Sequence, residues 1–117
     1  MVVTTTIYKI CDETLWRAAA AGGQFLGTAD DARDGFIHFS TASQLAGTAA
    51  KHFAGKTRLI LVAVDSGALG AELKWEPSRG GDLFPHLYGP LDPAVVRWAR
   101  PLPDEIDGRR VFPELEP

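Results

Sequence analysis

Short apolar runs separated by polar segments extend along the chain and predict its strands. The longest run lies within residues 58–65, where Leu-Ile-Leu-Val-Ala-Val is uninterrupted by any polar residue. A run of this length predicts a strand that is buried on both faces and central in a sheet. Shorter segments rich in β-branched, aromatic or alternating apolar residues predict further strands at residues 5–10, 35–40, 72–76 and 95–99.

Capping signals predict two helices in the first half of the chain. Asp12 is a candidate N-cap for a helix over 13–21, which the following Gly-Gly pair would end. Thr41-Ala-Ser-Gln44 fits the capping-box pattern and predicts a helix to about residue 53. The buried face of this second helix is predicted from residues spaced four apart, namely Leu45, Ala49 and Phe53.

The remaining segments predict connections. Residues 24–34 are expected to form a polar loop, and residues 66–70 a turn or a single helical turn. Pro93 can open a helical turn capped by Asp92, and the Pro-rich chain from about residue 101 is expected to be irregular. Helices early and paired strands late predict one α+β domain over residues 1–117, with two or three short helices.

Composition narrows the class of protein. The chain has 117 residues, of which 45% are hydrophobic and 23% charged, which is typical of a globular domain. The net charge of −3 and the lack of a dense Lys/Arg run give no general nucleic-acid footprint. A single cysteine, Cys11, and an N-terminus without a leader or membrane-span pattern favour a soluble cytoplasmic protein with no membrane partner. The oligomeric state is left open.

The segment 84–91, Phe-Pro-His-Leu-Tyr-Gly-Pro-Leu, is the strongest candidate for a ligand-facing surface. His86 and Tyr88 are two positions apart, so in extended chain their rings point to the same side. The prolines restrict the backbone and hold these rings with little freedom. The alternative is a structural turn in which Tyr88 packs on the core.

A second candidate is Gly35-Phe-Ile-His-Phe-Ser-Thr41. On a strand, His38 and Ser40 share a face with Phe36, and a histidine in so apolar a context needs a polar partner or a cleft. The alternative is a buried histidine hydrogen-bonded to backbone. The strand runs directly into a predicted helix start at Ser40 and Thr41, where free backbone N–H groups favour anions.

Glu76 and Arg79 form a third candidate. A carboxylate at a strand end beside a Gly-Gly loop can act as a general base or bind a sugar hydroxyl, and Arg79 in that loop can close over a ligand. Both can equally be solvated surface residues. His38, Glu76 and His86 also offer the ligand types of a two-histidine, one-carboxylate metal site, but their spacing does not support one. No metal is expected, and no phosphate-loop or zinc motif is present.

Several of these segments together resemble a bacterial family known as domain of unknown function 952. The resemblance extends from about residue 6 to Pro113, and the last of its motifs is long and distinctive. The resembling segments are Ile7-Tyr-Lys-Ile10, Asp34-Gly-Phe-Ile-His-Phe-Ser-Thr41, His52-Phe-Ala-Gly55, Leu59 to Asp65, and Trp75-Glu-Pro-Ser-Arg-Gly-Gly-Asp-Leu-Phe-Pro-His-Leu-Tyr-Gly-Pro-Leu91.

That family in turn is similar to the ADP-ribosyltransferase fold, which implies two small split antiparallel sheets around a cleft for NAD. The resemblance implies that NAD or a related nucleotide binds, and that its ADP-ribosyl group is transferred or hydrolysed. His38 would then orient the ribose, Glu76 would hold its 2′-hydroxyl as charge develops, and Tyr88 with His86 would clamp the base. Classical members carry the acidic residue after the stacking tyrosine, whereas Glu76 precedes Tyr88.

A binding module that does not turn over its ligand is the alternative to an enzyme. The same cleft would then recognise a small metabolite, a peptide or a nucleotide. A catalytic site requires a carboxylate and both rings to converge on one pocket. A Glu76 carboxylate directed into the cleft would favour the enzyme, and one directed to solvent would favour the module.

Overall fold

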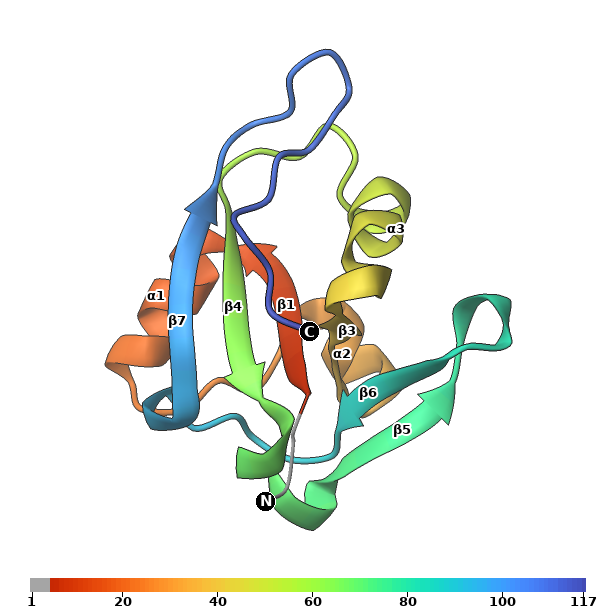
Figure 1. The fold of residues 1–117 in the computed structure, drawn as a ribbon. Helices are drawn as coiled ribbons and strands as arrows, with labels where there is room; N and C mark the ends of the chain where they lie inside the picture. The colour runs from red at the N-terminus through yellow and green to blue at the C-terminus, as the bar shows by residue number, and fades with distance from the viewer. Residues whose placement is uncertain (1–4) are drawn as a thin grey trace.

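The computed structural model of the protein describes residues 5–117, and its strands form two antiparallel sheets (Figure 1). The larger sheet has the strand order β3-β1-β4-β7, and the smaller has the order β2-β6-β5. Together with three α-helices they form an α+β fold, as predicted. The larger sheet consists of β1 (Thr6–Asp12), β3 (Ser40–Thr41), β4 (Leu59–Asp65) and β7 (Val96–Leu102), and the smaller of β2 (Ile37–His38), β5 (Leu73–Pro77) and β6 (Leu83–Leu87).

The predicted central strand is confirmed. β4 lies between β1 and β7, and its first six residues are all buried. Its side chains alternate between two apolar clusters, one on each face of the larger sheet. Because both faces are covered, every position of the strand can be apolar, which is why the run has no polar interruption.

The two predicted helices are confirmed as α1 (Glu13–Ala21) and α3 (Ala42–His52). The Asp12 carboxylate accepts a hydrogen bond from the backbone N–H of Leu15 at 2.9 Å and caps α1. Leu45 and Ala49 are buried on one face of α3, and Phe53 packs beside them as its C-cap. The predicted turns are also present, as single 3-10 turns at Ser66–Ala68 and Pro93–Val95.

The predicted polar loop over residues 24–34 is wrong in its second half, which forms α2 (Ala29–Asp34). Thr28 and Asp31 cap this helix reciprocally, with Thr28 N donating to the Asp31 carboxylate at 2.8 Å. Gly35 ends it in the left-handed region at φ 87°, where glycine is favoured. A helix of one and a half turns made of polar residues carries no apolar periodicity, so the hydrophobic pattern could not reveal it.

The predicted single strand over residues 35–40 is also wrong, because it divides between the sheets. His38 pairs with His86 in the smaller sheet, whereas Ser40 pairs with Tyr8 in the larger one. Phe39 lies at the crossing, and its N–H still donates to Pro85 O at 3.0 Å. The crossing chain joins the sheets and carries His38 to the boundary between them.

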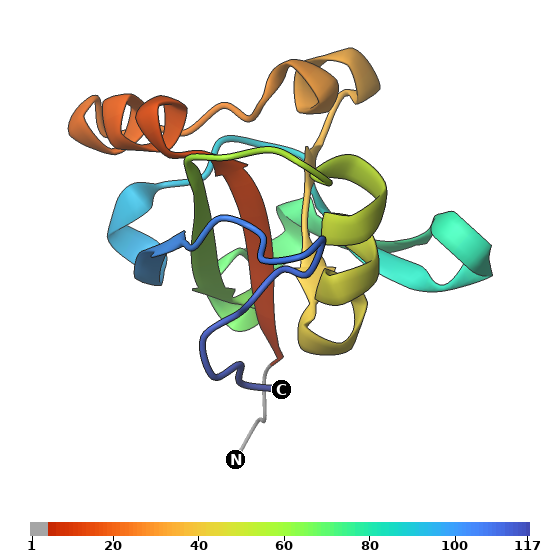
Figure 2. The ribbon, with the colours of Figure 1, turned by 90° about the horizontal axis from the view of Figure 1, so that it is seen from above.

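The C-terminal tail lies across the larger sheet, where Figure 2 shows it in blue. It is irregular apart from an isolated bridge between Ile106 and Arg109, as predicted, although β7 continues to Leu102 before it begins. The Tyr8 hydroxyl donates to Glu116 O at 2.9 Å, and Phe112 and Leu115 pack on the apolar cluster beneath. No helix within residues 5–117 has the length and apolar character needed to cross a membrane.

Candidate functional site

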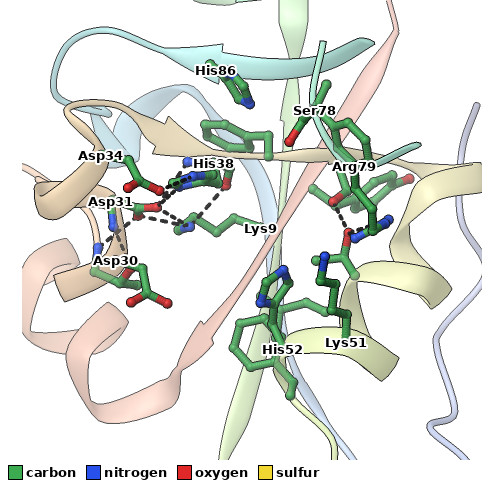
Figure 3. Close-up of a pocket in the computed structure, with 18 of the residues that line it drawn as sticks. Lys9, Asp30, Asp31, Asp34, His38, Lys51, His52, Ser78, Arg79 and His86 are labelled. Carbon is green, nitrogen blue, oxygen red and sulfur yellow. Dashed lines mark hydrogen bonds and ion pairs between the residues drawn. The ribbon is translucent and has the colours of Figure 1, made fainter. Parts of the chain in front are cut away.

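A cavity of about 290 Å³ opens where the smaller sheet meets β1, α2 and α3. Figure 3 shows Asp30, Asp31 and Asp34 on one side of the cavity and Lys51 and Arg79 on the other, with Lys9 between them and bonded to Asp31. The lining residues used below come from β1, α2, the chain crossing between the sheets, α3 and the β5–β6 segment, and they are Lys9, Asp30, Asp31, Asp34, His38, Ser40, Thr48, Lys51, His52, Ser78, Arg79 and His86.

Asp31 and Lys9 form a buried ion pair at the floor of the acidic side. Their side chains are 2% and 7% exposed, and Lys9 Nζ is 2.9 Å from Asp31 Oδ2. Lys9 Nζ also donates to His38 O at 3.0 Å. Each charge therefore has a close partner, which a buried ion requires.

Asp31 also holds His38. The His38 backbone N–H donates to Asp31 Oδ1 at 3.1 Å, and ring atom Nδ1 is 2.6 Å from the same oxygen. Burial alone would raise the pKa of Asp31, but the hydrogen bond from His38, the charge of Lys9 and the Thr28 N–H together lower it well below its usual range. The carboxylate therefore stays ionised and fixes the orientation of the imidazole.

Gly27 makes room for this carboxylate. A Cβ at residue 27 would lie 2.7 Å from Asp31 Cβ and 2.9 Å from Asp31 Oδ2, and the glycine has φ 101°. A larger residue would therefore clash with the helix cap and strain the backbone at the same time.

The second nitrogen of His38 faces another carboxylate. Nε2 is 3.0 Å from Asp34 Oδ2, and the His38 side chain is 37% exposed. Asp34 also pairs with Arg33, and the hydrogen bond from Arg33 is the main cause of the lowered pKa of Asp34. His38 is thus held on both sides by carboxylates of α2 while one edge of its ring remains open to the cavity.

His86 lies directly opposite His38 on the neighbouring strand. Its side chain is only 6% exposed, and Nδ1 is 2.9 Å from Glu76 Oε1. The Tyr88 hydroxyl donates to the same oxygen at 2.7 Å. These hydrogen bonds, first from Tyr88 and then from His86, lower the pKa of Glu76, and the carboxylate in turn raises the pKa of Tyr88.

Phe36 connects the two histidines. Its ring stacks on His86 with centroids 4.0 Å apart and lies 4.6 Å from His38 and 5.2 Å from Tyr88. The four rings form one continuous cluster on the face of the smaller sheet. This packing restricts the rotamers of both imidazoles.

The cationic side is built by Arg79 and Lys51, and His52 also lines the cavity. Arg79 donates to Thr48 Oγ1 at 3.4 Å and lies over the Phe84 ring, with its Cζ atom 4.9 Å from the centroid. Gly47 on α3 leaves space for it, since a Cβ there would be 3.1 Å from Arg79 Nη2. Burial is the largest cause of the lowered pKa of His52, followed by the charges of Lys51 and Arg79.

The predicted site residues divide between the cavity and its surroundings. His38, Ser40, Arg79 and His86 line the cavity, whereas Thr41, Glu76 and Tyr88 do not. The Ser40 hydroxyl is 2.8 Å from Thr48 Oγ1. Thr41 is the N-cap of α3, and its backbone N–H donates to Gln44 Oε1 at 3.0 Å. The Gln44 side chain therefore already accepts the hydrogen bond from this N–H, which was predicted to favour an anion.

The sequence reasoning missed the two charged groups on which His38 depends. Lys9 carried a usable signal, because a lysine inside the apolar strand Ile7-Tyr-Lys-Ile10 needs a buried partner. Asp31 carried none, since it is one of several acidic residues in a segment predicted to be a loop. Lys51 and His52 of α3 were missed because they look like ordinary C-terminal helix charges.

The hypothesis of a metal site formed by His38, Glu76 and His86 finds no support in the geometry. His38 directs its ring nitrogens to Asp31 and Asp34, whereas Glu76 is engaged with His86 and Tyr88. Within residues 5–117, no group of three His, Cys, Asp or Glu side chains is arranged to hold a metal ion.

The fold and the cleft define a small α+β domain with a charge-separated pocket between two antiparallel sheets. The sequence profile of the family described as "Protein of unknown function (DUF952)" matches residues 10–99. The chain belongs to this family.

Solved structures with the same fold come from Caulobacter crescentus. The crystal structure of protein CC0527 is 48% identical, covers 92% of this chain and 94% of its own, and superposes with a TM-score of 0.87. The solution NMR structure of CC0527 is 50% identical over 88% of this chain and 89% of its own, with a TM-score of 0.79. No curated protein matches the sequence.

Proposed function

We propose that the cavity is a nucleotide-binding site. The observation that carries the proposal is the separation of charge across one small pocket, with the carboxylates of α2 on one side and Lys51 and Arg79 on the other. A nucleotide has the matching polarity, because its phosphate is anionic and its ribose offers hydroxyl donors to carboxylates. A volume of about 290 Å³ is near the lower end of the ~300–1,000 Å³ typical of small-molecule sites.

The proposal assigns the phosphate to the cationic side. Arg79 presents a planar fork of donors that suits two phosphate oxygens, and its position is fixed by Thr48 and Phe84. Lys51 on α3 adds a mobile positive charge. On the opposite side, the ribose hydroxyls would reach Asp34 and the exposed edge of His38.

NAD is the first nucleotide to test, and transfer or hydrolysis of its ADP-ribosyl group is the reaction proposed for it. In that reaction His38 would orient the ribose, while Glu76, His86 and Tyr88 would act as one hydrogen-bonded unit. The carboxylates that line the cavity are those of α2, so Asp34 would be the acidic group nearest the ribose.

A binding module without catalysis is the second candidate, and the placement of Glu76 favours it. Glu76 does not line the cavity, and its side chain is 35% exposed. A carboxylate held in this way supports His86 instead of meeting a ligand directly. The proposal of nucleotide binding is common to both candidates.

Calorimetric titration with NAD, ADP-ribose and AMP tests the proposal. We expect saturable binding of at least one of them, weakened about tenfold or more in Arg79→Ala and less in Arg79→Lys, since a charge-assisted hydrogen bond contributes roughly 1.5–3 kcal/mol. Arg100→Ala is the matched control, because Arg100 lies over Trp98 on β7, away from the cavity.

Two further results distinguish an enzyme from a binding module and test whether the site binds nucleotides at all. Free nicotinamide in the NAD sample, abolished in His38→Asn, would support ADP-ribosyl chemistry, whereas binding without nicotinamide would support the module. Absence of heat and of any change in melting temperature with all three nucleotides at millimolar concentration would contradict the proposed function.

A further inference from the structure

Two imidazoles on adjacent strands face the same cavity. His38 of β2 and His86 of β6 are directly opposite each other in the antiparallel register, so their side chains lie on the same face of the smaller sheet. Their ring centroids are 5.6 Å apart. Each ring is anchored through Nδ1 by a carboxylate, Asp31 for His38 and Glu76 for His86. Figure 3 shows both rings at the cavity.

The hydrogen-bond partners of the two rings favour different numbers of ring protons. His86 donates its Nδ1 proton to Glu76, and the structure gives its Nε2 no hydrogen-bond partner within residues 5–117. In the neutral ring this Nε2 is a lone-pair acceptor at the cavity. His38 has a carboxylate at both nitrogens, Asp31 at 2.6 Å and Asp34 at 3.0 Å. Only the imidazolium form donates to both.

With His86 neutral and His38 as imidazolium, one neighbour is a base and the other an acid. An aligned pair of this kind is suited to reactions in which a proton leaves a nucleophile as another reaches a leaving group. The polar cavity wall includes no cysteine, and Cys11 is buried in the core with its pKa raised by that burial to about 11. Ser40 is hydrogen-bonded to Thr48 and not to a base. Water from the open cavity is a nucleophile that this site can use.

We propose, building on the proposed nucleotide site, that the protein hydrolyses a nucleoside 2′,3′-cyclic phosphate. His86 Nε2 takes a proton from water as the water oxygen bonds to phosphorus. The bond between phosphorus and one ribose oxygen breaks, and His38 Nε2 gives its proton to that oxygen. The product is a nucleoside monophosphate, and proton exchange with solvent restores both rings.

The cyclic phosphate fits the charge pattern better than a longer polynucleotide. Its single phosphate would meet Arg79 and Lys51, and a mononucleotide is in scale with a cavity of about 290 Å³. The substrate supplies a strained ester bond, and the reaction requires no co-reactant other than water. Asp34 would leave His38 Nε2 when the leaving oxygen takes its place, which its half-exposed position at the end of α2 permits.

The test is to incubate the protein with adenosine 2′,3′-cyclic phosphate in the presence of EDTA and to follow phosphorus NMR. We expect conversion of the cyclic signal to one monoester signal. His86→Asn keeps a donor for Glu76 but lacks the distal nitrogen, and His38→Asn does the same for Asp31. Each variant should lower the rate by about 10²–10⁴-fold, the usual contribution of a positioned acid or base. Arg100→Ala should leave the rate unchanged.

Binding of the two possible products, adenosine 2′-monophosphate and adenosine 3′-monophosphate, is measured by calorimetry on the same samples. Product binding without turnover of the cyclic phosphate would overturn the proposed hydrolysis and leave the nucleotide site intact. Failure to bind the cyclic phosphate and its products, while NAD, ADP-ribose or AMP still binds, would overturn the proposed hydrolysis alone, and failure to bind any of these nucleotides would overturn both proposals. An unchanged rate in His86→Asn and His38→Asn, with both variants folded by melting temperature, would overturn the assignment of the histidines.

Discussion

The two histidine–carboxylate pairs in the cleft have the same chemistry and opposite surroundings. Asp31 is 2% exposed and bonded to Lys9, Thr28 and His38, whereas Glu76 is 35% exposed and bonded to Tyr88 and His86. The exposures of the rings are reversed, since His38 is the open ring and His86 the buried one. At each pair, one partner is held by the protein interior and the other meets solvent.

This difference in exposure predicts which property of the protein each pair affects. The Asp31 pair joins β1, α2 and β2 through a buried charge network, so its loss should affect the fold. The Glu76 pair joins neighbouring strands of one sheet through an exposed carboxylate, where solvent screens its charge. Its loss should affect the protonation of Tyr88 and leave the fold largely intact.

Asp31→Asn should therefore give the largest effect. The substitution leaves the Lys9 ammonium buried without its counter-charge, and breaking a buried pair from one side costs about 3–5 kcal/mol. We expect the free energy of unfolding, measured by denaturant titration, to fall by about this amount. Asp34→Asn is the matched control on the same helix, and its half-exposed side chain predicts a much smaller change. Equal losses in the two variants would contradict the assigned difference.

Acid should reproduce part of this loss. The pKa of Asp31 is lower in the folded than in the unfolded chain, so its stabilising contribution is complete above the unfolded value near 4 and is lost progressively as the pH falls below it. We expect the melting temperature of the protein to fall between about pH 4 and pH 2. Asp31→Asn should show a flatter acid limb, with the remaining slope due to groups such as Asp34 and Glu76, whose pKa values are also lowered.

The same contrast explains what the sequence could predict. β4 and α3 were predicted because burial imposes a repeating apolar pattern, and such a pattern is visible in one segment alone. His38 and His86 were predicted as candidate site residues because a polar ring in an apolar strand is unusual wherever it occurs, and both line the cavity. The two-sheet architecture was expected through resemblance to a family, and the alternation of the strands alone did not specify it.

The role of Asp31 and the division of residues 35–40 between the two sheets both depend on contacts between residues that are far apart in the sequence. Asp31 lies on a short polar helix, and only its partners on β1 and β2 distinguish it from the neighbouring aspartates. Residues 35–40 were predicted as one strand because local propensity does not record which sheet each residue joins. Tertiary pairing determines these two features. A single sequence does not specify such pairing where the segment carries no local signal for it.

Removing the ring of Phe36, which contacts both histidines, should have an intermediate effect on the free energy of unfolding. Phe36 is half-buried and contacts His38, His86 and Tyr88, so Phe36→Ala loses both apolar burial and ring contacts. We expect the free energy of unfolding to fall by about 1–2 kcal/mol. Phe36→Leu keeps the apolar burial without the ring, so it should recover part of the loss. Full recovery in Phe36→Leu would contradict a specific role for the stacked rings.

Glu76→Gln should give the smallest change in stability, with a clear spectroscopic signature. In the protein, the Tyr88 hydroxyl donates to the Glu76 carboxylate, and this hydrogen bond is the largest cause of the raised pKa of Tyr88, followed by burial and by the charge of Glu76. Glutamine can still accept a hydrogen bond through its amide oxygen, but the bond is weaker because the acceptor carries no charge. The phenolate of Tyr88 should therefore form at lower pH in Glu76→Gln, while the melting temperature near neutral pH changes little.

A titration of tyrosinate absorbance measures this shift with few competing signals, because the chain has two tyrosines. Tyr8 is buried beneath the C-terminal tail, and burial is the main cause of its raised pKa, so Glu76→Gln should leave its titration unchanged. Tyr88→Phe identifies the step that belongs to Tyr88 by removing it. If the curves of the protein and of Glu76→Gln superimpose, Glu76 does not control Tyr88 in solution. If Glu76→Gln also lowers the melting temperature as much as Asp31→Asn, the contrast between the two pairs fails.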